Sequence, residues 1–350
     1  GSVLSAWAVG SECVLEVRTD PTRQDALSEA LLAAPWEVLC REGVFLAEDR
    51  RRLFTVSRRC AGMGDPVVPR YSDLSLMFMA AALEGQSELD YEAEETAILE
   101  ATRSKTGGAP LAHVLVEESG TLEFLAERLR LDGPFESLHL SCHGDILKTE
   151  DDTAPSPVLL FETAAGGADT VQPDRLIGDL EGVIPPLVFV SACRTAERGV
   201  SRGTPHPAPE GYRDAGGTVT GEPPELADPF VRQLTVQVAN VLGWDGSVYD
   251  ADATRFAEAL YGALARGETV PRAAALARRA LFEARNDDPQ LGRHWHLARV
   301  YLGPGGGGTL CDSTLDPRPA RPDPEEPFLD KRDKRVPVAT RAEFVGRRRH

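Results

Sequence analysis

Short apolar runs alternate with helical patterns along most of the chain. Continuous apolar runs bounded by turn residues are typical of strands that are buried on both faces of a parallel sheet. These runs lie at residues 76–81, 112–116, 137–142, 187–193, 236–242 and 296–302. Between most of them, leucine or alanine recurs at the spacing of one helix face. We therefore predict an α/β fold with a mostly parallel central sheet and helices on both faces, over residues 70–303.

A small mixed α/β region is predicted ahead of this body, and a linker is predicted behind it. We take residues 1–11 as a tag or leader and residues 12–69 as an N-terminal preface. The glycine run and the proline- and charge-rich stretch after it are typical of a flexible linker, which we place at residues 304–340. Inside the body, residues 194–228 are rich in glycine, proline and charge without periodicity, and long loops of this kind are often functional.

The chain is acidic, and its charge is unevenly distributed. The formal net charge is −17, although residues 331–350 carry eight lysine or arginine residues against two acidic ones. A body this acidic repels phosphate backbones, so we exclude nucleic acid as its partner. The basic tail is either a nucleic-acid patch or, as we prefer, a solvated linker.

Cysteine spacing and the lengths of the apolar runs indicate a cytoplasmic protein. The six cysteines show no C-x-x-C spacing, which argues against a zinc site and against a disulfide framework. No apolar run approaches the roughly 20 residues that a membrane-spanning helix needs, and no signal peptide is recognisable. No phosphate-binding G-x-x-x-x-G-K-[ST] motif and no dinucleotide-binding glycine fingerprint occur, so we expect no cofactor and no metal.

Two of the predicted strands end in residues that can perform nucleophilic chemistry. The run 137–142 leads into His143 and Gly144, and the run 187–192 leads into Cys193, 50 residues after the histidine. Because the carboxyl ends of parallel strands meet at one edge of a sheet, both side chains are expected at one crevice. A histidine beside a cysteine favours the thiolate, which is the nucleophile in acyl transfer. The backbone N–H groups of Gly144 and Cys193 would form an oxyanion hole.

Each of these residues also has an ordinary structural explanation. A cysteine at a strand end is often an inert core residue, and a histidine there can be a satisfied core or turn residue. Cys142 is a competing thiol, but alternation sends Cys142 and His143 to opposite faces, so we predict that Cys142 lies in the core. His294 and His296 are a weak metal signal, and packing of Trp295 at the start of the last strand is the preferred explanation.

Four aspartates are candidates for recognising the substrate at the same edge of the sheet: Asp145, Asp245, Asp250 and Asp252. Any of them could line an S1 pocket and favour arginine or lysine at P1, because a buried carboxylate seeks a cationic partner. The alternative is that Asp250 or Asp252 caps the helix predicted at residues 253–265.

The two strand ends resemble the two motifs of a known family. Residues 138–144 (LHLSCHG) and 188–195 (VFVSACRT) are similar to the histidine and cysteine motifs of CHAT domains, which are caspase-like peptidase domains of clan CD. The likeness extends to the Pro-Trp-Glu element at 34–39, the acidic helix start at 89–92 and the late helix at 256–267. It covers about residues 12–303.

This resemblance implies a caspase-like fold and a regulated cysteine endopeptidase acting on a protein or peptide. His143 would be the general base or imidazolium partner and Cys193 the nucleophile, and the family needs no third side chain. The alternative is a catalytically silent caspase-like adaptor or protein-interaction domain. Residues 194–228 are longer than the corresponding connection in many members. They are either a plain solvated loop or a cover over the cleft that is moved or cut on activation.

Residues 343–349 resemble the Phe-Val-Gly-Arg segment that opens many STAND-type NTPase modules. We therefore expect residues 341–350 to be the start of such a module. The resemblance implies a bacterial sensor, defence or signalling protein whose NTPase oligomerises and activates the peptidase. The partners expected for this chain are a protein substrate and its own C-terminal NTPase region.

Overall fold

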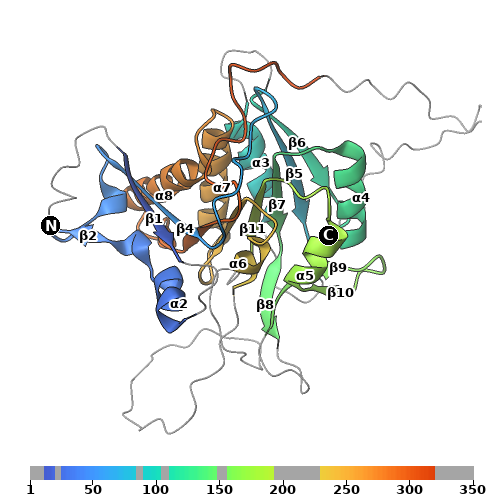
Figure 1. The fold of residues 1–350 in the computed structure, drawn as a ribbon, viewed down its shortest axis with the longest axis horizontal. Coiled ribbons are helices and arrows are strands. Elements are labelled where there is room, and N and C mark those ends of the chain that lie inside the picture. Colours follow the sequence, from blue (N-terminus) through green and yellow to red (C-terminus); the bar gives the residue numbers. More distant parts are fainter. Residues whose placement is uncertain are drawn as a thin grey trace, which may run out of the picture.

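The computed structural model describes residues 12–19, 25–83, 90–103, 110–147, 156–192 and 229–319. Their centre is an eight-stranded sheet with the order β1-β4-β13-β12-β11-β7-β5-β6 (Figure 1). Every neighbouring pair is parallel except β12 and β13. The predicted mostly parallel α/β sheet is confirmed.

The strands of this sheet follow the apolar runs of the sequence closely. They are β1 (Glu12–Arg18), β4 (Leu53–Arg59), β5 (Leu74–Ala80), β6 (Ala112–Glu117), β7 (Ser137–Ser141), β11 (Leu187–Ser191), β12 (Asn240–Trp244) and β13 (Ala298–Leu302). Two small sheets accompany it: β8 (His143–Leu147), β9 (Ser156–Glu162) and β10 (Ala168–Val171) form one, and β2 (Cys40–Arg41) and β3 (Val44–Phe45) form the other.

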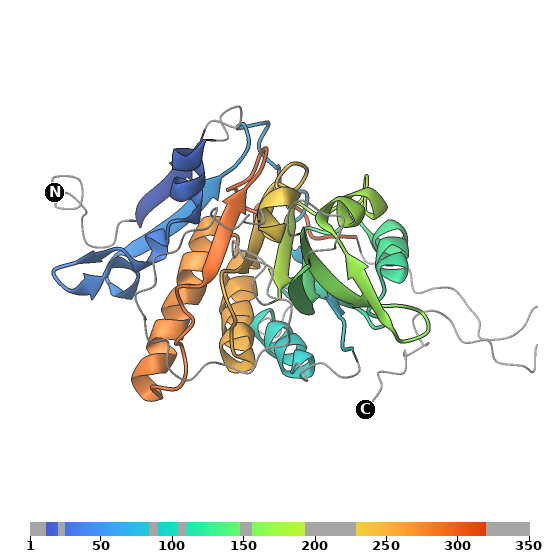
Figure 2. The same cartoon turned by 90° about the horizontal axis from the view of Figure 1, so that it is seen from below.

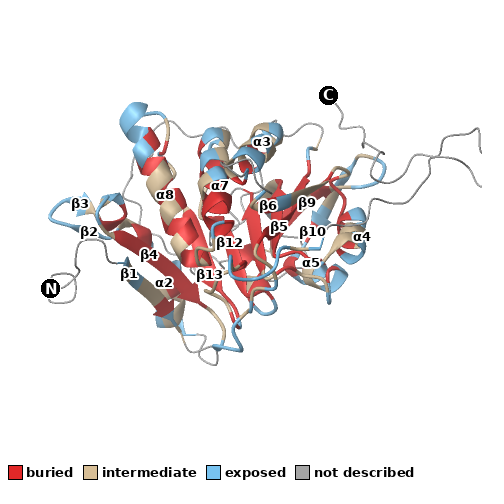
Figure 3. Cartoon of the chain, turned by 90° about the horizontal axis from the view of Figure 1, so that it is seen from above, coloured by how far each residue is buried: buried red, intermediate tan, exposed pale blue. Residues whose placement is uncertain are grey.

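Helices cover both faces of the sheet, and alternation along each strand divides the core between them. On one face lie α3 (Tyr91–Ala101), α7 (Asp250–Leu264) and α8 (Val270–Asp287); on the other lie α4 (Leu122–Asp132), α5 (Pro173–Asp179) and α6 (Phe230–Leu234). In β11, Leu187 and Phe189 pack on the first face, and Val188 and Val190 pack on the second. Figure 3 shows the buried strands and the buried inner sides of α7 and α8, and Figure 2 shows those helices along one side of the sheet.

The preface is continuous with this sheet. β1 pairs with β4, and β4 pairs with β13 near the end of the domain. The helix α2 (Ala26–Ala33) and the short 3-10 helices η1 (Trp36–Val38) and η2 (Leu46–Glu48) lie between β1 and β4 in the sequence. The structure therefore has no boundary at residue 69 within its described part, since one sheet runs through both regions.

One strand lies later than its apolar run predicts. The sequence predicts a strand at residues 236–242, whereas β12 begins at Asn240. Residues 235–238 form the turn that closes α6, with the Val238 N–H donating to the carbonyl of Leu234, and Val236 is exposed. Apolar character alone does not distinguish the turn from the strand.

The glycine run is packed on the domain, contrary to the predicted linker that begins at residue 304. We call residues 303–319 the C-terminal strap. A Cβ atom at Gly306 would lie 1.8 Å from the carbonyl oxygen of Ala239, so only glycine permits this approach. Leu310 and Cys311 are buried. The rest of the predicted linker, residues 320–340, lies outside the described part.

The strap ends on the side of the sheet where its parallel strands begin. The guanidinium of Arg318 pairs with Glu136 and lies 4.3 Å from the ring centroid of Tyr71. The backbone N–H of Arg318 donates to Asp73 at 2.7 Å.

Among the described residues, no helix has both the length and the apolar character that crossing a membrane requires.

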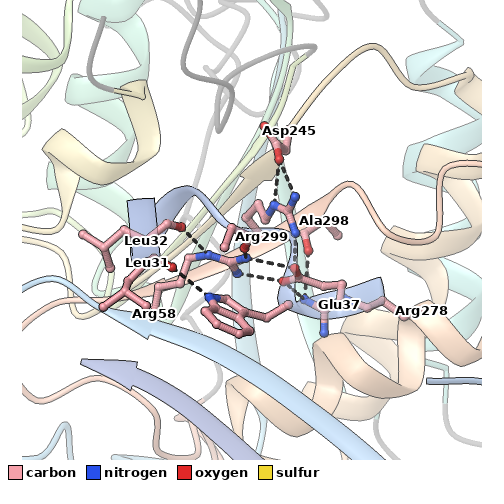
Figure 4. A network of polar contacts seen from close by, with 10 residues as sticks. Leu31, Leu32, Glu37, Arg58, Asp245, Arg278, Ala298 and Arg299 are labelled. Carbon is pink, nitrogen blue, oxygen red and sulfur yellow. Dashed lines mark hydrogen bonds and ion pairs between the residues drawn. The ribbon is translucent and has the colours of Figure 1, made fainter. Parts of the chain in front are cut away.

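A buried ion network fastens the preface to the rest of the domain (Figure 4). Glu37 of η1 is fully buried and accepts two hydrogen bonds from Arg58 of β4, at 2.7 and 2.9 Å. It also pairs with Arg299 of β13 and lies 3.5 Å from Arg278 of α8. Burial alone would raise the pKa of Glu37, but the guanidinium groups outweigh it and lower the pKa to about 2. Trp36 supports the turn by donating to the carbonyl of Leu31.

Replacing Glu37 with alanine should strongly destabilise the domain, because three buried guanidinium groups lose their shared counter-charge. We expect the free energy of unfolding at neutral pH to fall by about 3–5 kcal/mol, measured by chemical denaturation. Glu181→Ala, at an exposed turn glutamate, is the matched control and should change this free energy by less than about 0.5 kcal/mol.

The loss in Glu37→Ala should also depend on pH. A carboxyl whose pKa is lowered on folding stabilises the folded state above its unfolded pKa, and this stabilisation disappears as the pH falls to the folded pKa. For Glu37 this window runs from 4.5 down to about 2. The difference in stability between wild type and Glu37→Ala should shrink across the window, and a constant difference would contradict the assignment.

A methyl group at Gly306 should destabilise the domain if the strap is part of it. Gly306→Ala places Cβ against the Ala239 carbonyl, so we expect a loss of about 1–3 kcal/mol in the free energy of unfolding. Gly62→Ala is the control, because the described structure places nothing within 4 Å of the added carbon. Equal stability of the two variants would show that the strap is a free linker.

Candidate active site

The strands that precede the two candidate catalytic residues are neighbours. β7 and β11 are parallel and paired in register, with Ser141 opposite Ser191. His143 follows Ser141 by two residues, and Cys193 follows Ser191 by two residues. The predicted adjacency of the two strands is therefore confirmed. Cys193 and residues 194–228 lie outside the described residues.

His143 and Gly144 begin the next strand, β8. His143 pairs with Leu160 of β9, and Gly144 pairs with Leu159. His143 and Gly144 are half-buried. Cys142, just before them, is buried and packs in the core on the α4 side of the sheet. The prediction that Cys142 is a core residue is confirmed.

Beneath these strand ends lies a carboxylate that the sequence does not single out. Glu94 of α3 is buried, and it accepts hydrogen bonds from Ser141 at 2.9 Å and from Ser191 at 3.0 Å. Its Oε1 also lies 3.2 Å from Nε2 of His139. Burial alone would raise the pKa of Glu94, but the histidine and the two serines outweigh it and lower the pKa, so the carboxylate stays ionised.

His139 connects this carboxylate to α7. Its Nδ1 lies 3.2 Å from the hydroxyl of Tyr261, and its ring stacks on Phe78 and meets Phe189 edge-on. Burial raises the pKa of Tyr261, so the phenol keeps its proton. A protonated phenol can donate to Nδ1 or accept from an Nδ1–H, so this contact joins α7 to β7 in either tautomer of His139.

A second acidic group lies where α3 and α7 begin. Asp90 caps α3 by accepting from the Ala93 N–H at 3.2 Å, and Asp250 accepts from the Asp90 N–H at 3.3 Å. Burial raises the pKa of Asp250, and the charges of Glu94 and Asp90 raise it further. His143 and the Asp90 N–H act in the opposite direction. Asp250 therefore lies within the electrostatic reach of His143.

Two of the four candidate aspartates, Asp245 and Asp252, bind an arginine or histidine side chain of the protein. Asp245 pairs with Arg299, which joins it to the Glu37 network (Figure 4). Asp252 is buried and accepts from the Gly292 N–H at 2.6 Å and from His294 Nδ1 at 2.7 Å. Asp145 is exposed on β8, and Asp250 is half-buried at the start of α7. These last two remain as S1 candidates.

The capping alternative for Asp250 and Asp252 is wrong. The helix begins at Asp250, earlier than predicted, and Tyr249 occupies its N-cap position.

Trp295 packs as predicted at the start of the last strand. It is buried, and its ring centroid lies 4.2 Å from that of Phe282 and 5.2 Å from that of Phe45. Among the described residues, no three histidine, cysteine or carboxylate side chains are grouped to hold a metal.

Several solved structures are distantly similar to this chain. Gingipain R, an Arg-specific cysteine proteinase, is 10% identical with a TM-score of 0.44, covering 86% of this chain and 65% of its own. Separase from Saccharomyces cerevisiae, in complex with securin, is 14% identical with a TM-score of 0.43, covering 78% of this chain. Caspase-1 from Spodoptera frugiperda is 11% identical with a TM-score of 0.35, covering 71% of this chain and 93% of its own. The chain spans only 15% of the separase chain.

Sequence comparison with protein families assigns most of the chain. No curated protein matches it. The family model of the CHAT domain matches residues 26–305, from the start of α2 to the glycine run of the strap. The matched residues include both strand ends, Glu94 and the Glu37 network. The chain therefore belongs to the CHAT domain family.

Proposed function

We propose that this chain is a regulated cysteine endopeptidase of caspase-like fold that uses a Cys193–His143 dyad. The observation that carries the proposal is the register pairing of Ser141 with Ser191. It brings the residues two positions before His143 and Cys193 to the same level on neighbouring strands. Membership of the CHAT family supports a peptidase.

The chemistry follows from these two residues. His143 takes the proton of the Cys193 thiol, and the thiolate attacks the scissile carbonyl carbon. The N–H groups of Gly144 and Cys193 hold the resulting oxyanion. The imidazolium then protonates the departing amine, which leaves an acyl-enzyme. A water molecule, deprotonated by His143, hydrolyses that thioester and restores the thiol.

Asp250 is our preferred S1 residue for arginine or lysine at P1, with Asp145 as the second candidate. A half-buried carboxylate whose pKa is raised by burial and by neighbouring acids gains most from a cationic partner. Glu94 and Asp90 add negative potential to the same corner. Asp245 and Asp252 already bind the side chains of Arg299 and His294 and are less suited to this role.

Regulation completes the proposal. We infer that the chain works in the cytoplasm of a bacterium as the effector of a sensor, defence or signalling protein, and that a STAND-like NTPase beginning near residue 341 activates it by oligomerising. Residues 194–228 would cover the cleft until activation. Intact residues 194–228 in fully active protein, seen by mass spectrometry, would exclude activation by cleavage there.

The proposed dyad predicts that Cys193→Ala and His143→Ala each abolish peptide-bond cleavage. The assay incubates activated protein, with its C-terminal region present, with candidate protein partners and with a peptide library. Cys40→Ala is the control, because Cys40 is an exposed cysteine on β2 and should leave cleavage unchanged. Cleavage that persists in Cys193→Ala would exclude the dyad, and binding of partners without cleavage would favour the adaptor alternative.

The proposed S1 pocket predicts a charge-specific loss. Asp250→Asn should lower kcat/KM for substrates with arginine at P1 by about tenfold or more, because a charge-assisted pair is replaced by a neutral contact. Substrates with an apolar P1 residue should change much less. Asp145→Asn tests the second candidate, and Asp287→Asn, at an exposed position near the end of α8, is the control. A library cleaved only after acidic or apolar residues would exclude a basic S1 preference.

A further inference from the structure

The carboxylate of Glu94 joins the two strand ends that carry the proposed dyad. It accepts from Ser141 at the last position of β7 through Oε2 and from Ser191 at the last position of β11 through Oε1. Both serines are buried and lie opposite each other in the register. Each of them is two residues before a proposed catalytic residue. One side chain from a third element therefore holds both strand ends.

The surroundings of Glu94 favour a rigid, ionised clamp. Hydrogen bonds to an ionised acceptor are about twice as strong as neutral ones. His139 of β7 faces Oε1 at 3.2 Å and is itself held by Tyr261 of α7. The N-cap Asp90 of α3 is acidic, as are Glu92, Asp250 and Asp252 in the first turns of α3 and α7. The hydrogen-bond donors to Glu94 come from the strands.

A buried serine in a protein core needs only one hydrogen-bond partner for its hydroxyl, and two such serines need not share that partner. Ser137, at the other end of β7, shows this simpler case: it is buried and lies 3.5 Å from the hydroxyl of Tyr261. Ser141 and Ser191 differ because they share a single acceptor across two strands. Moving either strand end along its axis would break one of the two hydrogen bonds to Glu94.

We propose that Glu94 is a positioning residue that sets the distance between His143 and Cys193 by clamping Ser141 and Ser191. The inference rests on the proposed dyad and adds what holds it together. Removing either serine hydroxyl releases one strand end, which loosens the dyad and makes the thiolate less favoured. Ser137→Ala removes another buried hydroxyl from the same strand, one whose partner is Tyr261 and not Glu94.

The test uses activated protein with its C-terminal region present and measures alkylation of Cys193 by iodoacetamide between about pH 5 and pH 9. Mass spectrometry identifies the modified peptide. This readout needs no substrate and reports the thiolate directly. The variants are Ser141→Ala, Ser191→Ala and Glu94→Gln, with Ser137→Ala as the matched control and His143→Ala as the reference for a broken dyad. Thermal unfolding of each variant establishes that it is folded.

We expect His143→Ala to slow alkylation at pH 6 by about tenfold or more and to move the profile to the higher pH of an ordinary thiol. Ser141→Ala and Ser191→Ala should move the profile in the same direction and slow alkylation at pH 6 at least threefold. Ser137→Ala should leave the profile unchanged, even where it lowers the melting temperature. If Glu94→Gln does not fold, the two serine variants decide the question.

The remaining outcomes separate the two proposals. If His143→Ala shifts the profile and the serine variants behave like Ser137→Ala, the clamp is wrong and the dyad stands. If His143→Ala leaves the pH profile of alkylation unchanged, the dyad is wrong. The clamp proposal is then overturned too, because it rests on the dyad. If Ser137→Ala shifts the profile as much as Ser141→Ala and Ser191→Ala, the effect is general loosening of the core, and the clamp is overturned.

Discussion

A charge buried in a protein must be paired, and this constraint shapes the domain at two places. Isolated buried carboxylates are too unfavourable to remain ionised, so each collects donors from whichever elements surround it. Glu37 gathers arginines from β4, α8 and β13 and thereby fastens the preface to the sheet. Glu94 gathers two serines and a histidine from β7 and β11 and thereby fastens the strand ends to α3. The first network stabilises the fold, and the second lies directly beneath the candidate active site.

Apolar periodicity was sufficient to predict the sheet and insufficient to predict its details. Strands buried on both faces appear as continuous apolar runs, and β5, β7 and β11 lie within a few residues of their predicted positions. The run at residues 236–242 misled because a turn and a strand can be equally apolar. The glycine run misled because glycine is typical both of linkers and of backbones that pack closely against each other. Composition does not distinguish these two uses, whereas the oxygen atoms that crowd Gly306 do.

The candidate site was predictable where it depends on strand order and unpredictable where it depends on contacts between distant elements. His143 and Cys193 were found from strand ends, a local pattern. Glu94 was missed, although a signal exists: Ser137, His139 and Ser141 place polar side chains on one face of an apolar strand, which requires a polar partner on the covering helix. The three aspartates that follow β12 looked alike in the sequence. The structure separates them, because Asp245 and Asp252 bind basic side chains whereas Asp250 accepts from a backbone N–H.

The register of β7 is fixed at both of its ends, and this determines the geometry of the active-site edge. At the start of the strand, Glu136 pairs with Arg318 of the strap and accepts from the Ser75 N–H at 3.1 Å. At its end, Ser141 is bound to Glu94. A slip by one residue would turn Leu138 and Leu140 toward Glu94 and would bury the serines and His139 in the apolar core on the α4 side. Both the polar and the apolar contacts oppose that slip, so the level of His143 relative to the end of β11 is set by residues that themselves take no part in the proposed chemistry.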